Sequence, residues 1–393
     1  MAGLFVILCV LLLVAYICSK QDIFSPSVLT AGIWLFCLLL FVVLPNRLPA
    51  LQQQFLLCAG MWSGCFVLSS LSMQSLSYSS KKMQCSATIR DLYFWISIAC
   101  IPALLLFVYR AIAYGTTDSM ALNLRMATLG ENTKVGEDTY TPMYYTLWLA
   151  TYLLYLIDAN KKHWKRTVIL GCLTLLFGIA TMSKTMILTV GIITLFVLYK
   201  RGIISTKYIL IGGAAVLAMM IILQGIRHSM SMDKEEVENI FELYILRGFC
   251  AFDTLRPCSS PHFGENVFRI FYAIPYKLGW SSIEPIDPIL PWVYEPVATN
   301  TYTVMYPFFL DFGYVGVGVF AVVLGAGVGW LYKKSEQGNS FYTILYAYFC
   351  VMIVMQYVQD NFFTNLAGVI KFVLLLSLPY IVGNYQLLRK KTI

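Results

Sequence analysis

Apolar residues gather in long runs along the chain rather than in the narrow stripes of soluble amphipathic helices. A helix needs about 20 predominantly apolar residues to cross a bilayer. Eleven runs approach that length and predict membrane-spanning helices over residues 2–18, 27–44, 51–71, 92–113, 141–158, 167–182, 185–199, 208–226, 304–332, 340–358 and 362–386. The first run lacks the basic start and the small-residue cleavage site of a signal peptide, so we expect it to stay as a helix. The pattern predicts an all-α polytopic membrane protein with one integral membrane domain, residues 1–393.

Two polar segments between these runs are long. The first covers residues 114–140 and the second residues 227–303, and loops of that length usually have a function of their own. The second holds seven prolines, so it is not one continuous helix. Near its start, Asp233 and Glu236 have the spacing of a capping box. An apolar stripe with a period of 3.6 residues follows and predicts an amphipathic helix that carries Arg247 on its apolar face.

Composition narrows the class of protein. Hydrophobic residues make up 59% of the chain and charged residues 12%, whereas a soluble domain carries about 25% charged residues. A soluble enzyme, a coiled coil, a disordered tail and a disulfide-stapled secreted domain are therefore excluded. The net charge of +8 lies mostly in short runs between apolar segments, so we expect no nucleic-acid partner.

The distribution of Lys and Arg predicts the orientation. One set of short loops carries 16 of the 28 basic residues and only four of the 20 acidic residues. Basic residues collect in the short cytoplasmic loops of membrane proteins. We therefore expect the N-terminus and both long loops on the outer, periplasmic side of a bacterial inner membrane, and the C-terminus in the cytoplasm.

Cations in the two outer loops are candidates for anion binding. The first loop contributes Arg125, and the second contributes Arg227, Arg247 and Arg269. A guanidinium group binds phosphate oxygens in bidentate geometry, which suits a phosphate or pyrophosphate ligand. Lys184, in the turn between the runs 167–182 and 185–199, is a further candidate. The alternative is that these cations pair with acids of the same loops, such as Asp253 and Glu265.

Few residues could act as a general base. Asp311 lies inside the run 304–332, where an ionisable residue is costly and is a functional candidate. Its alternative role is an ion pair with Lys371. Histidine side chains ordinarily change charge near neutral pH, so His228 is the second candidate. Cys250 and Cys258 are close enough in sequence for a disulfide, and the Cys and His spacings indicate no metal site.

Several short motifs stand out along the chain: Asp22-Ile23-Phe24-Ser25-Pro26-Ser27, Met182-Ser183-Lys184-Thr185, Arg247, Asn300-Thr301-Tyr302-Thr303 and Asp311-Phe312-Gly313 with Gly316. They resemble motifs of the Wzy-type O-antigen polymerase family, the oligosaccharide repeat-unit polymerases of bacterial envelopes. The layout of about eleven spans and one dominant outer loop also resembles that family over the whole chain.

The resemblance implies a fold and a reaction. The fold is a membrane-embedded architecture like that of the C-type glycosyltransferases (GT-C). The reaction moves a growing glycan from undecaprenyl pyrophosphate onto the nonreducing end of a lipid-linked repeat unit, without nucleotide sugar, cofactor or metal. A chain-length regulator protein is the expected partner. The resemblance implies that cations bind the pyrophosphate, and the candidates are Arg247, Arg227, Arg269, Arg125 and Lys184. Asp311 or His228 would remove the proton from the acceptor hydroxyl. Asn300 and Tyr306 would make other contacts with the substrate.

Three alternatives share parts of this pattern. An O-antigen ligase has the same architecture but transfers glycan to a lipid A core. A flippase or other transporter of lipid-linked oligosaccharide is disfavoured because the two halves show no internal repeat. A scaffold for envelope assembly is disfavoured by the cations of the outer loops.

Overall fold

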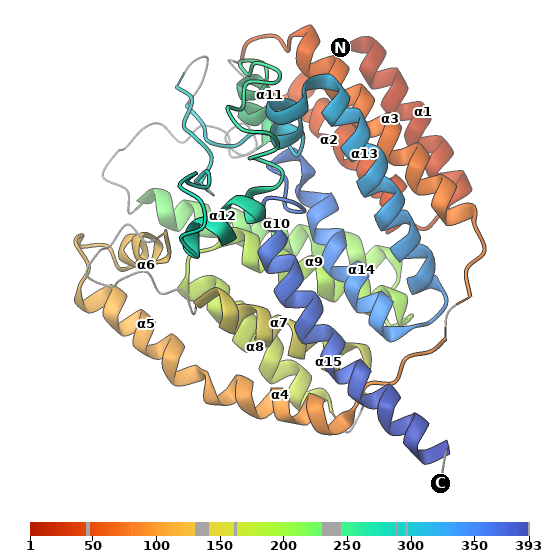
Figure 1. The fold of residues 1–393 in the computed structure, drawn as a ribbon, viewed down its shortest axis with the longest axis vertical. Helices are drawn as coiled ribbons and strands as arrows, with labels where there is room; N and C mark the ends of the chain where they lie inside the picture. The colour runs from red at the N-terminus through yellow and green to blue at the C-terminus, as the bar shows by residue number, and fades with distance from the viewer. Residues whose placement is uncertain are drawn as a thin grey trace. The chain divides into compact units, whose positions relative to one another are not determined.

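The computed structural model describes the chain except residues 45–47, 80, 130–140, 161–162, 230–244, 288, 295–297 and 392–393. Within the described residues the regular structure is helical, apart from one isolated antiparallel bridge between Val293 and Thr299. Figure 1 shows how the helices follow one another along the chain. The apolar runs form these helices because a helix satisfies its own backbone hydrogen bonds in an apolar environment.

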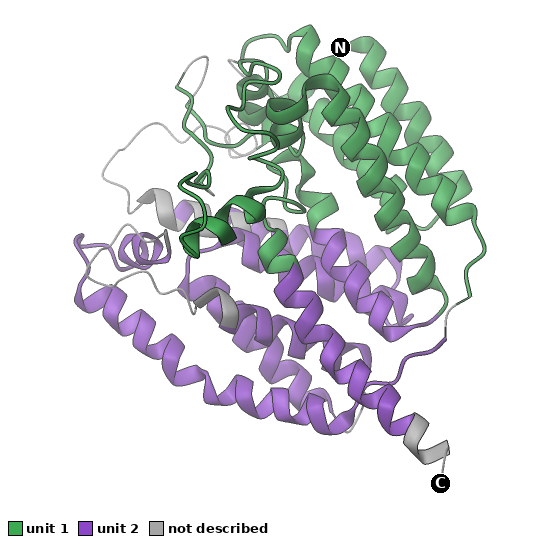
Figure 2. Ribbon diagram, in the orientation of Figure 1, with its two compact units in different colours: residues 1–80, 238–337, 352–369 green, residues 81–237, 338–351, 370–393 purple. Residues whose placement is uncertain are grey.

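The chain folds into two compact units (Figure 2). Unit 1 comprises residues 1–80, 238–337 and 352–369. Its helices are α1 (Ala2–Cys18), α2 (Pro26–Val43), α3 (Gln53–Ser75), α11 (Arg247–Phe252), α12 (Arg269–Lys277), α13 (Tyr306–Glu336) and the 3-10 turn η2 (Met355–Tyr357). Unit 2 comprises residues 81–237, 338–351 and 370–393. Its helices are α4 (Ala87–Ala99), α5 (Ile101–Ala113), α6 (Met120–Leu129), α7 (Thr141–Ile157), α8 (Trp164–Ala180), α9 (Lys184–Lys200), α10 (Thr206–Ser229) and most of α14 (Ser340–Val354) and α15 (Leu366–Lys391).

Helices α3 and α13 form the closest helix pair of unit 1. A Cβ atom at Gly325 would lie 2.5 Å from the Phe66 carbonyl oxygen, and one at Gly329 would lie 2.5 Å from that of Ser70. Only glycine permits such an approach of two backbones. The spacing Ala321, Gly325, Gly329 predicts a small-residue packing face, and this contact confirms it.

Helix α13 is broken at Gly313, which has φ +60° and ψ −149°. Glycine is nearly alone in tolerating this conformation. The break leaves the carbonyl groups of the preceding turn available, and the large loop uses them. The Cys258 N–H donates to the Phe309 oxygen at 3.2 Å, and the Ser260 N–H donates to the Leu310 oxygen at 3.3 Å. The loop is therefore attached to the broken helix by main-chain bonds.

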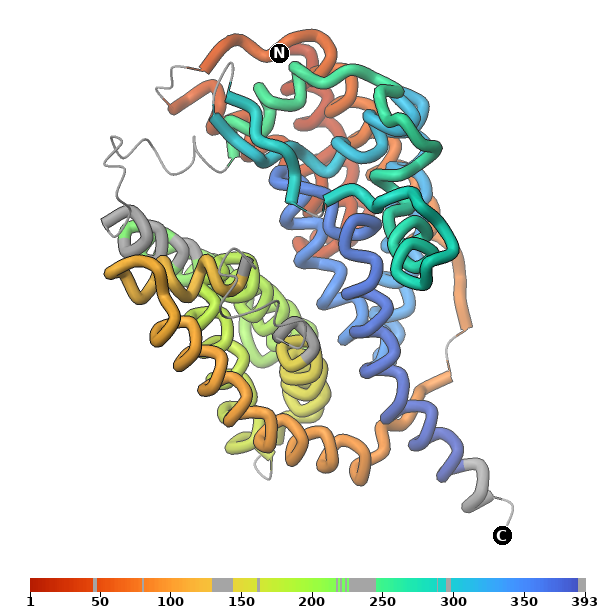
Figure 3. The backbone as a smooth tube through the Cα atoms, turned by 60° about the vertical axis from the view of Figure 1, so that its left-hand side comes forward, coloured from red at the N-terminus to blue at the C-terminus, as the bar shows by residue number. Residues whose placement is uncertain are grey.

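In unit 2, α4 and α5 form a bent rod rather than one straight helix (Figure 3). The bend lies at Cys100 and Ile101, next to Pro102, because proline removes a backbone donor and clashes with the preceding turn. The predicted run 92–113 is therefore two helices. Apolar side chains of α5, α6, α7, α8 and α9 form the core of this unit, with Trp148 and Phe177 fully buried in it.

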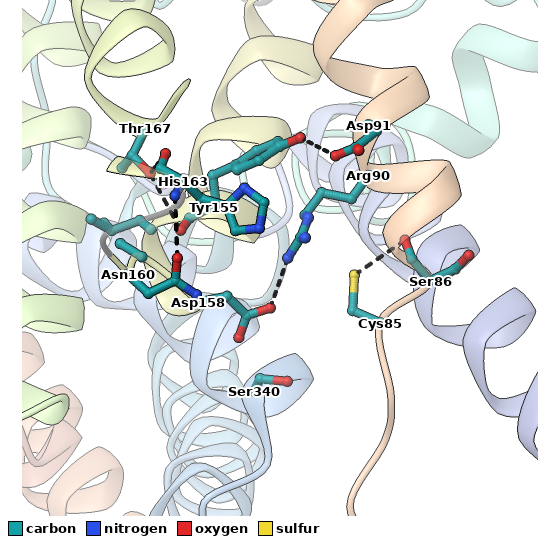
Figure 4. A network of polar contacts seen from close by, with 12 residues as sticks. Cys85, Ser86, Arg90, Asp91, Tyr155, Asp158, Asn160, His163, Thr167 and Ser340 are labelled. Carbon is teal, nitrogen blue, oxygen red and sulfur yellow. Dashed lines mark hydrogen bonds and ion pairs between the residues drawn. The ribbon is translucent and has the colours of Figure 1, made fainter. Parts of the chain in front are cut away.

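Charged side chains at one end of unit 2 pair directly with each other. Arg90 bonds Asp158 at 3.0 Å, and Arg166 bonds Asp91 at 2.8 Å. The Tyr155 hydroxyl donates to Asp91 at 2.5 Å, and its ring lies 4.9 Å beneath the Arg90 guanidinium. Figure 4 shows Arg90, Asp91, Tyr155 and Asp158 in this network. The charge pattern of the sequence predicts a cytoplasmic position for Arg90, Asp91, Asp158 and Arg166.

All eleven predicted runs coincide with helices of the structure. Within the described residues, six helices are long and apolar enough to cross a membrane, and shorter apolar helices cover Ala2–Cys18, Tyr144–Ile157 and Thr206–Val216. The six are Pro26–Val43, Gln53–Ser75, Ala87–Ala113, Tyr306–Glu336, Ser340–Tyr357 and Leu366–Leu387. A polytopic all-α membrane protein is confirmed. The count of eleven spans and the GT-C-like architecture stay predictions.

Candidate functional site

The carboxylate of Asp311 lies where the large loop meets α13. Its Oδ1 accepts hydrogen bonds from the Ser260 hydroxyl at 2.6 Å and from the Asn266 side-chain amide at 2.7 Å. Its Oδ2 accepts from the backbone N–H of Val267 at 2.8 Å and of Asn266 at 3.1 Å. Neutral donors therefore surround the carboxylate and tie residues 260–267 to the helix.

This geometry gives Asp311 an anchoring role. A carboxylate that accepts two bonds on each oxygen has little capacity left to receive a proton from a substrate. Lys371, the alternative partner expected from the sequence, belongs to unit 2. The hypothesis that Asp311 is the general base stays a prediction, and its anchoring contacts explain why an acid occurs at this depth.

Arg247 is buried at the start of α11, with 8% of its surface exposed. Its guanidinium donates to the Ala298 carbonyl at 3.2 Å. The neighbouring Gly248 brings α11 against the same segment, because a Cβ there would lie 3.3 Å from the Thr301 oxygen. Arg247 and Asn300 are therefore carried by adjoining segments. The amphipathic helix predicted upstream of Arg247 falls almost wholly in residues 230–244, outside the described residues.

Arg269 begins α12 and is partly exposed. Its Nε donates to the Ile286 carbonyl at 2.7 Å. Asp253, expected as an acidic partner for these arginines, instead accepts from the backbone N–H groups of Gln52 at 2.7 Å and Phe55 at 2.9 Å, at the start of α3. Burial raises the pKa of Asp253, and the two backbone bonds oppose that shift. At this position a main-chain cap replaces the expected ion pair.

The remaining candidates lie in unit 2. Arg125 is on α6 and Lys184 is the first residue of α9, both partly exposed. Arg227 and His228 belong to the last turns of α10, and their side chains lie outside the described residues. Unit 1 thus holds Arg247, Arg269, Asn300, Tyr306 and Asp311, while unit 2 holds the other four.

Unit 1 contains a cavity of about 250 Å³ beside the start of α13. One part of its wall is apolar or aromatic, from Leu290, Tyr306 and Pro307. The rest is polar, from Gln359, Asp360, Asn361, Thr364 and Asn365. Tyr306, predicted to contact substrate, is therefore a wall residue of a cavity. The centroid of its ring also lies 4.5 Å from the ring centroid of Tyr302.

Two backbone bonds bring the distant parts of this wall together. The Tyr302 N–H donates to the Val358 oxygen at 3.1 Å, and the Val304 N–H donates to the Gln356 oxygen at 2.8 Å. The Gln356 side chain is fully buried and accepts from the indole N–H groups of Trp34 at 3.1 Å and Trp62 at 3.2 Å. These bonds fix the segment before α13 against the segment before α15.

Asp360 organises the polar part of the wall. Its Oδ1 accepts from the Phe362 N–H at 2.9 Å, and its Oδ2 accepts from the N–H groups of Phe363 at 3.0 Å and Thr364 at 2.9 Å. These bonds hold residues 360–364 in a tight turn. Burial raises the pKa of Asp360 to about 6, although the three backbone donors pull it down.

The apolar runs 340–358 and 362–386 predict only a short connection over residues 359–361, so the pattern of the sequence does not predict this turn. The available signal was the triplet Gln359-Asp360-Asn361, three polar residues between two apolar runs. Cys250 and Cys258, both described, are not joined by a disulfide. In the part of the chain that the structure describes, no group of three or more His, Cys, Asp and Glu side chains could hold a metal ion.

Comparisons with known proteins agree with the sequence motifs. A family model described as "Putative O-antigen polymerase" matches residues 5–355. An O-antigen polymerase of Shigella dysenteriae is 28% identical over 216 residues, which are 52% of this chain and 52% of that protein. The match thus spans about half the length of that curated relative. No solved structure matches the chain.

Proposed function

The chain belongs to the O-antigen polymerase family, and from this premise we propose that it polymerises lipid-linked oligosaccharide repeat units in O-antigen synthesis. The proposed donor is a growing glycan on undecaprenyl pyrophosphate. The proposed acceptor is the nonreducing end of an undecaprenyl-pyrophosphate-linked repeat unit. The observation that carries this proposal is the family match over residues 5–355, which includes α11 and the whole of α13.

The leaving group sets the chemical demand on the site. Negative charge develops on undecaprenyl pyrophosphate as its bond to the anomeric carbon breaks, and preorganised cations stabilise that charge. Arg247 is our first candidate because it is buried and held in place by the Ala298 carbonyl. Arg269 is likewise oriented by a carbonyl, which its Nε bonds, and the terminal nitrogens of a guanidinium are donors that suit phosphate oxygens. Arg227, Arg125 and Lys184 complete the proposed set.

The other parts of the proposal follow from the same reaction. We place it at the periplasmic face of the inner membrane, with the N-terminus periplasmic and the C-terminus cytoplasmic, on the charge pattern of the loops. The transfer is proposed to be metal-independent, with His228 or Asp311 receiving the acceptor proton. A chain-length regulator protein is the proposed partner.

The test is deletion of the gene in its host, with surface polysaccharide resolved by gel electrophoresis. We expect glycan limited to a single repeat unit in the deletion strain, and restored polymer with the wild-type gene. Arg247→Ala should fail to restore polymer at equal membrane abundance, and Arg247→Lys should restore it in part. Arg256→Ala, at an exposed arginine of the same loop, is the matched control and should restore polymer fully.

Other outcomes would replace the proposal. Loss of all attached glycan with accumulation of lipid-linked polymer would identify a ligase. Lipid-linked single units trapped on the cytoplasmic side would identify a flippase.

A further inference from the structure

The cavity of unit 1 has walls of two chemical kinds. Tyr306, Pro307 and Leu290 present apolar surface, whereas the turn 359–365 presents three amide side chains, a hydroxyl and a carboxylate. A sugar ring has the same division, with C–H groups on its faces and hydroxyl groups around its edge. Aromatic side chains can pack against the C–H faces of the ring, and amide side chains can form hydrogen bonds with its hydroxyl groups. The cavity volume of about 250 Å³ lies just below the range of roughly 300–1,000 Å³ for small-molecule sites, which suits one ring rather than a chain.

Asn361 supplies a second, independent observation. Its Oδ1 accepts a hydrogen bond from the Gln359 side-chain amide at 3.0 Å, which fixes how the Asn361 amide is turned. Its Nδ2 is buried and has no hydrogen-bond partner among the residues that the structure describes. A buried donor without an acceptor is costly, and native proteins rarely keep one without a reason. Asn361 lines the cavity, so a ligand oxygen that reaches this nitrogen from the cavity would satisfy it.

The charge of the wall limits the ligand further. Asp360 lines the cavity, and the lining residues that the structure describes include no Lys or Arg. An anionic group such as pyrophosphate or a uronic acid would meet a buried carboxylate without a compensating cation, which is unfavourable. The amides and the carboxylate can instead bond the hydroxyl groups of an uncharged ring.

We propose that this cavity is a subsite for one neutral sugar ring of the lipid-linked glycan, with Asn361 donating to a ring substituent and Tyr306 packing on the ring. The inference rests on the proposed function and adds a subsite to it. Asp360 is a positioning residue, because its backbone bonds hold the turn that presents Asn361 and Thr364.

The experiment measures polymerisation in membranes that contain the full chain. The probe is the lipid-linked repeat unit extracted from the deletion strain, titrated to give KM and kcat separately. Asn361→Leu removes the donor at similar volume, and Asn361→Asp replaces the donor with an acceptor while keeping the shape. We expect each change to raise KM roughly tenfold or more. Gln53→Leu, at an exposed amide of α3 outside the cavity, is the matched control and should leave KM unchanged.

The outcomes separate the subsite from the proposed function. If the wild type extends the probe and both Asn361 variants keep its KM, the subsite is wrong and the polymerase proposal stands. The same holds if the variants lose activity only in proportion to folded protein, with KM unchanged. If the wild type does not extend the probe, the polymerase proposal fails and the subsite fails with it.

Discussion

Unit 1 and unit 2 bond the carboxylates of their aspartates in different ways. In unit 2, Asp158 and Asp91 are bonded by Arg90 and Arg166. In unit 1, Asp311 and Asp360 are bonded by backbone N–H groups, a hydroxyl and an amide. Within the described residues, both ion pairs of the protein belong to unit 2.

The difference separates two uses of a carboxylate. An ion pair joins two side chains and cancels their charges, and at the exposures found here, 10% and 46% for Arg90 and Asp158, water weakens it. A carboxylate bonded by main-chain donors instead fixes the path of a loop. Unit 1 uses its acids for the second purpose, beside the segments that carry Arg247 and Asn300.

The largest expected effect is at Asp311. Asp311→Ala leaves several buried donors without an acceptor, each costing about 1–3 kcal/mol, so we expect a loss of roughly 3–5 kcal/mol of unfolding free energy. Thermal unfolding of the detergent-purified protein measures the loss. Asp311→Asn keeps the shape and one acceptor and should lose less. A stable Asp311→Asn variant without polymerisation would contradict the purely anchoring role and support the base role.

A smaller effect is expected from pH at Asp360. Burial raises its pKa to about 6 in the fold, from an ordinary value of 3.8, so the folded state binds the proton more tightly than the unfolded state does. The contribution of Asp360 to the free energy of unfolding is therefore fully present below pH 3.8, and it is lost as the pH rises through 6. The change is roughly 2 kcal/mol between pH 4 and pH 7.

Thermal unfolding across that pH range tests the effect, with Asp360→Asn as the comparison. The variant should be less stable overall, because its amide N–H₂ meets backbone donors, but it should lose this part of the pH dependence. An unchanged pH profile in Asp360→Asn would show that Asp360 does not titrate near 6.

The smallest effects are expected at the ion pairs of unit 2. A double-mutant cycle on Arg166 and Asp91, whose side chains are 32% and 42% exposed, should give a coupling of about 0.2–1 kcal/mol. Raising the salt concentration should reduce it, because solvent-exposed charges are screened. A coupling of several kcal/mol that resists salt would remove the contrast between the units.

The helices could be predicted from the sequence more closely than the site. The run 2–18 corresponds to α1, Ala2–Cys18, because a long apolar run has one stable form in a membrane. The bend between α4 and α5 could have been expected from Pro102. The break in α13 is harder to predict from the sequence, because Asp311-Phe312-Gly313 lies within an apolar run. Gly313 adopts its conformation where Pro257 and Cys258 of the large loop pack against it.

The cavity could not be predicted from the sequence, for a different reason. Tyr306 was a candidate for substrate contact, but its polar neighbours across the cavity lie more than 50 residues later in the chain. Their register depends on the backbone bonds from Tyr302 and Val304, and such long-range bonds leave no local pattern in the residues that form them. The signal in the sequence was the polar triplet Gln359-Asp360-Asn361 between two apolar runs.

The backbone pairing before α13 has a consequence for how this protein could change. The pairing uses main-chain atoms and the buried Gln356, so it does not depend on which side chains face the cavity. Positions such as Asn361 and Asn365 can therefore be exchanged one at a time while the frame around them keeps its register. If the cavity binds sugar, substitutions there offer a short mutational route to a polymer of altered composition, with the rest of the enzyme unchanged.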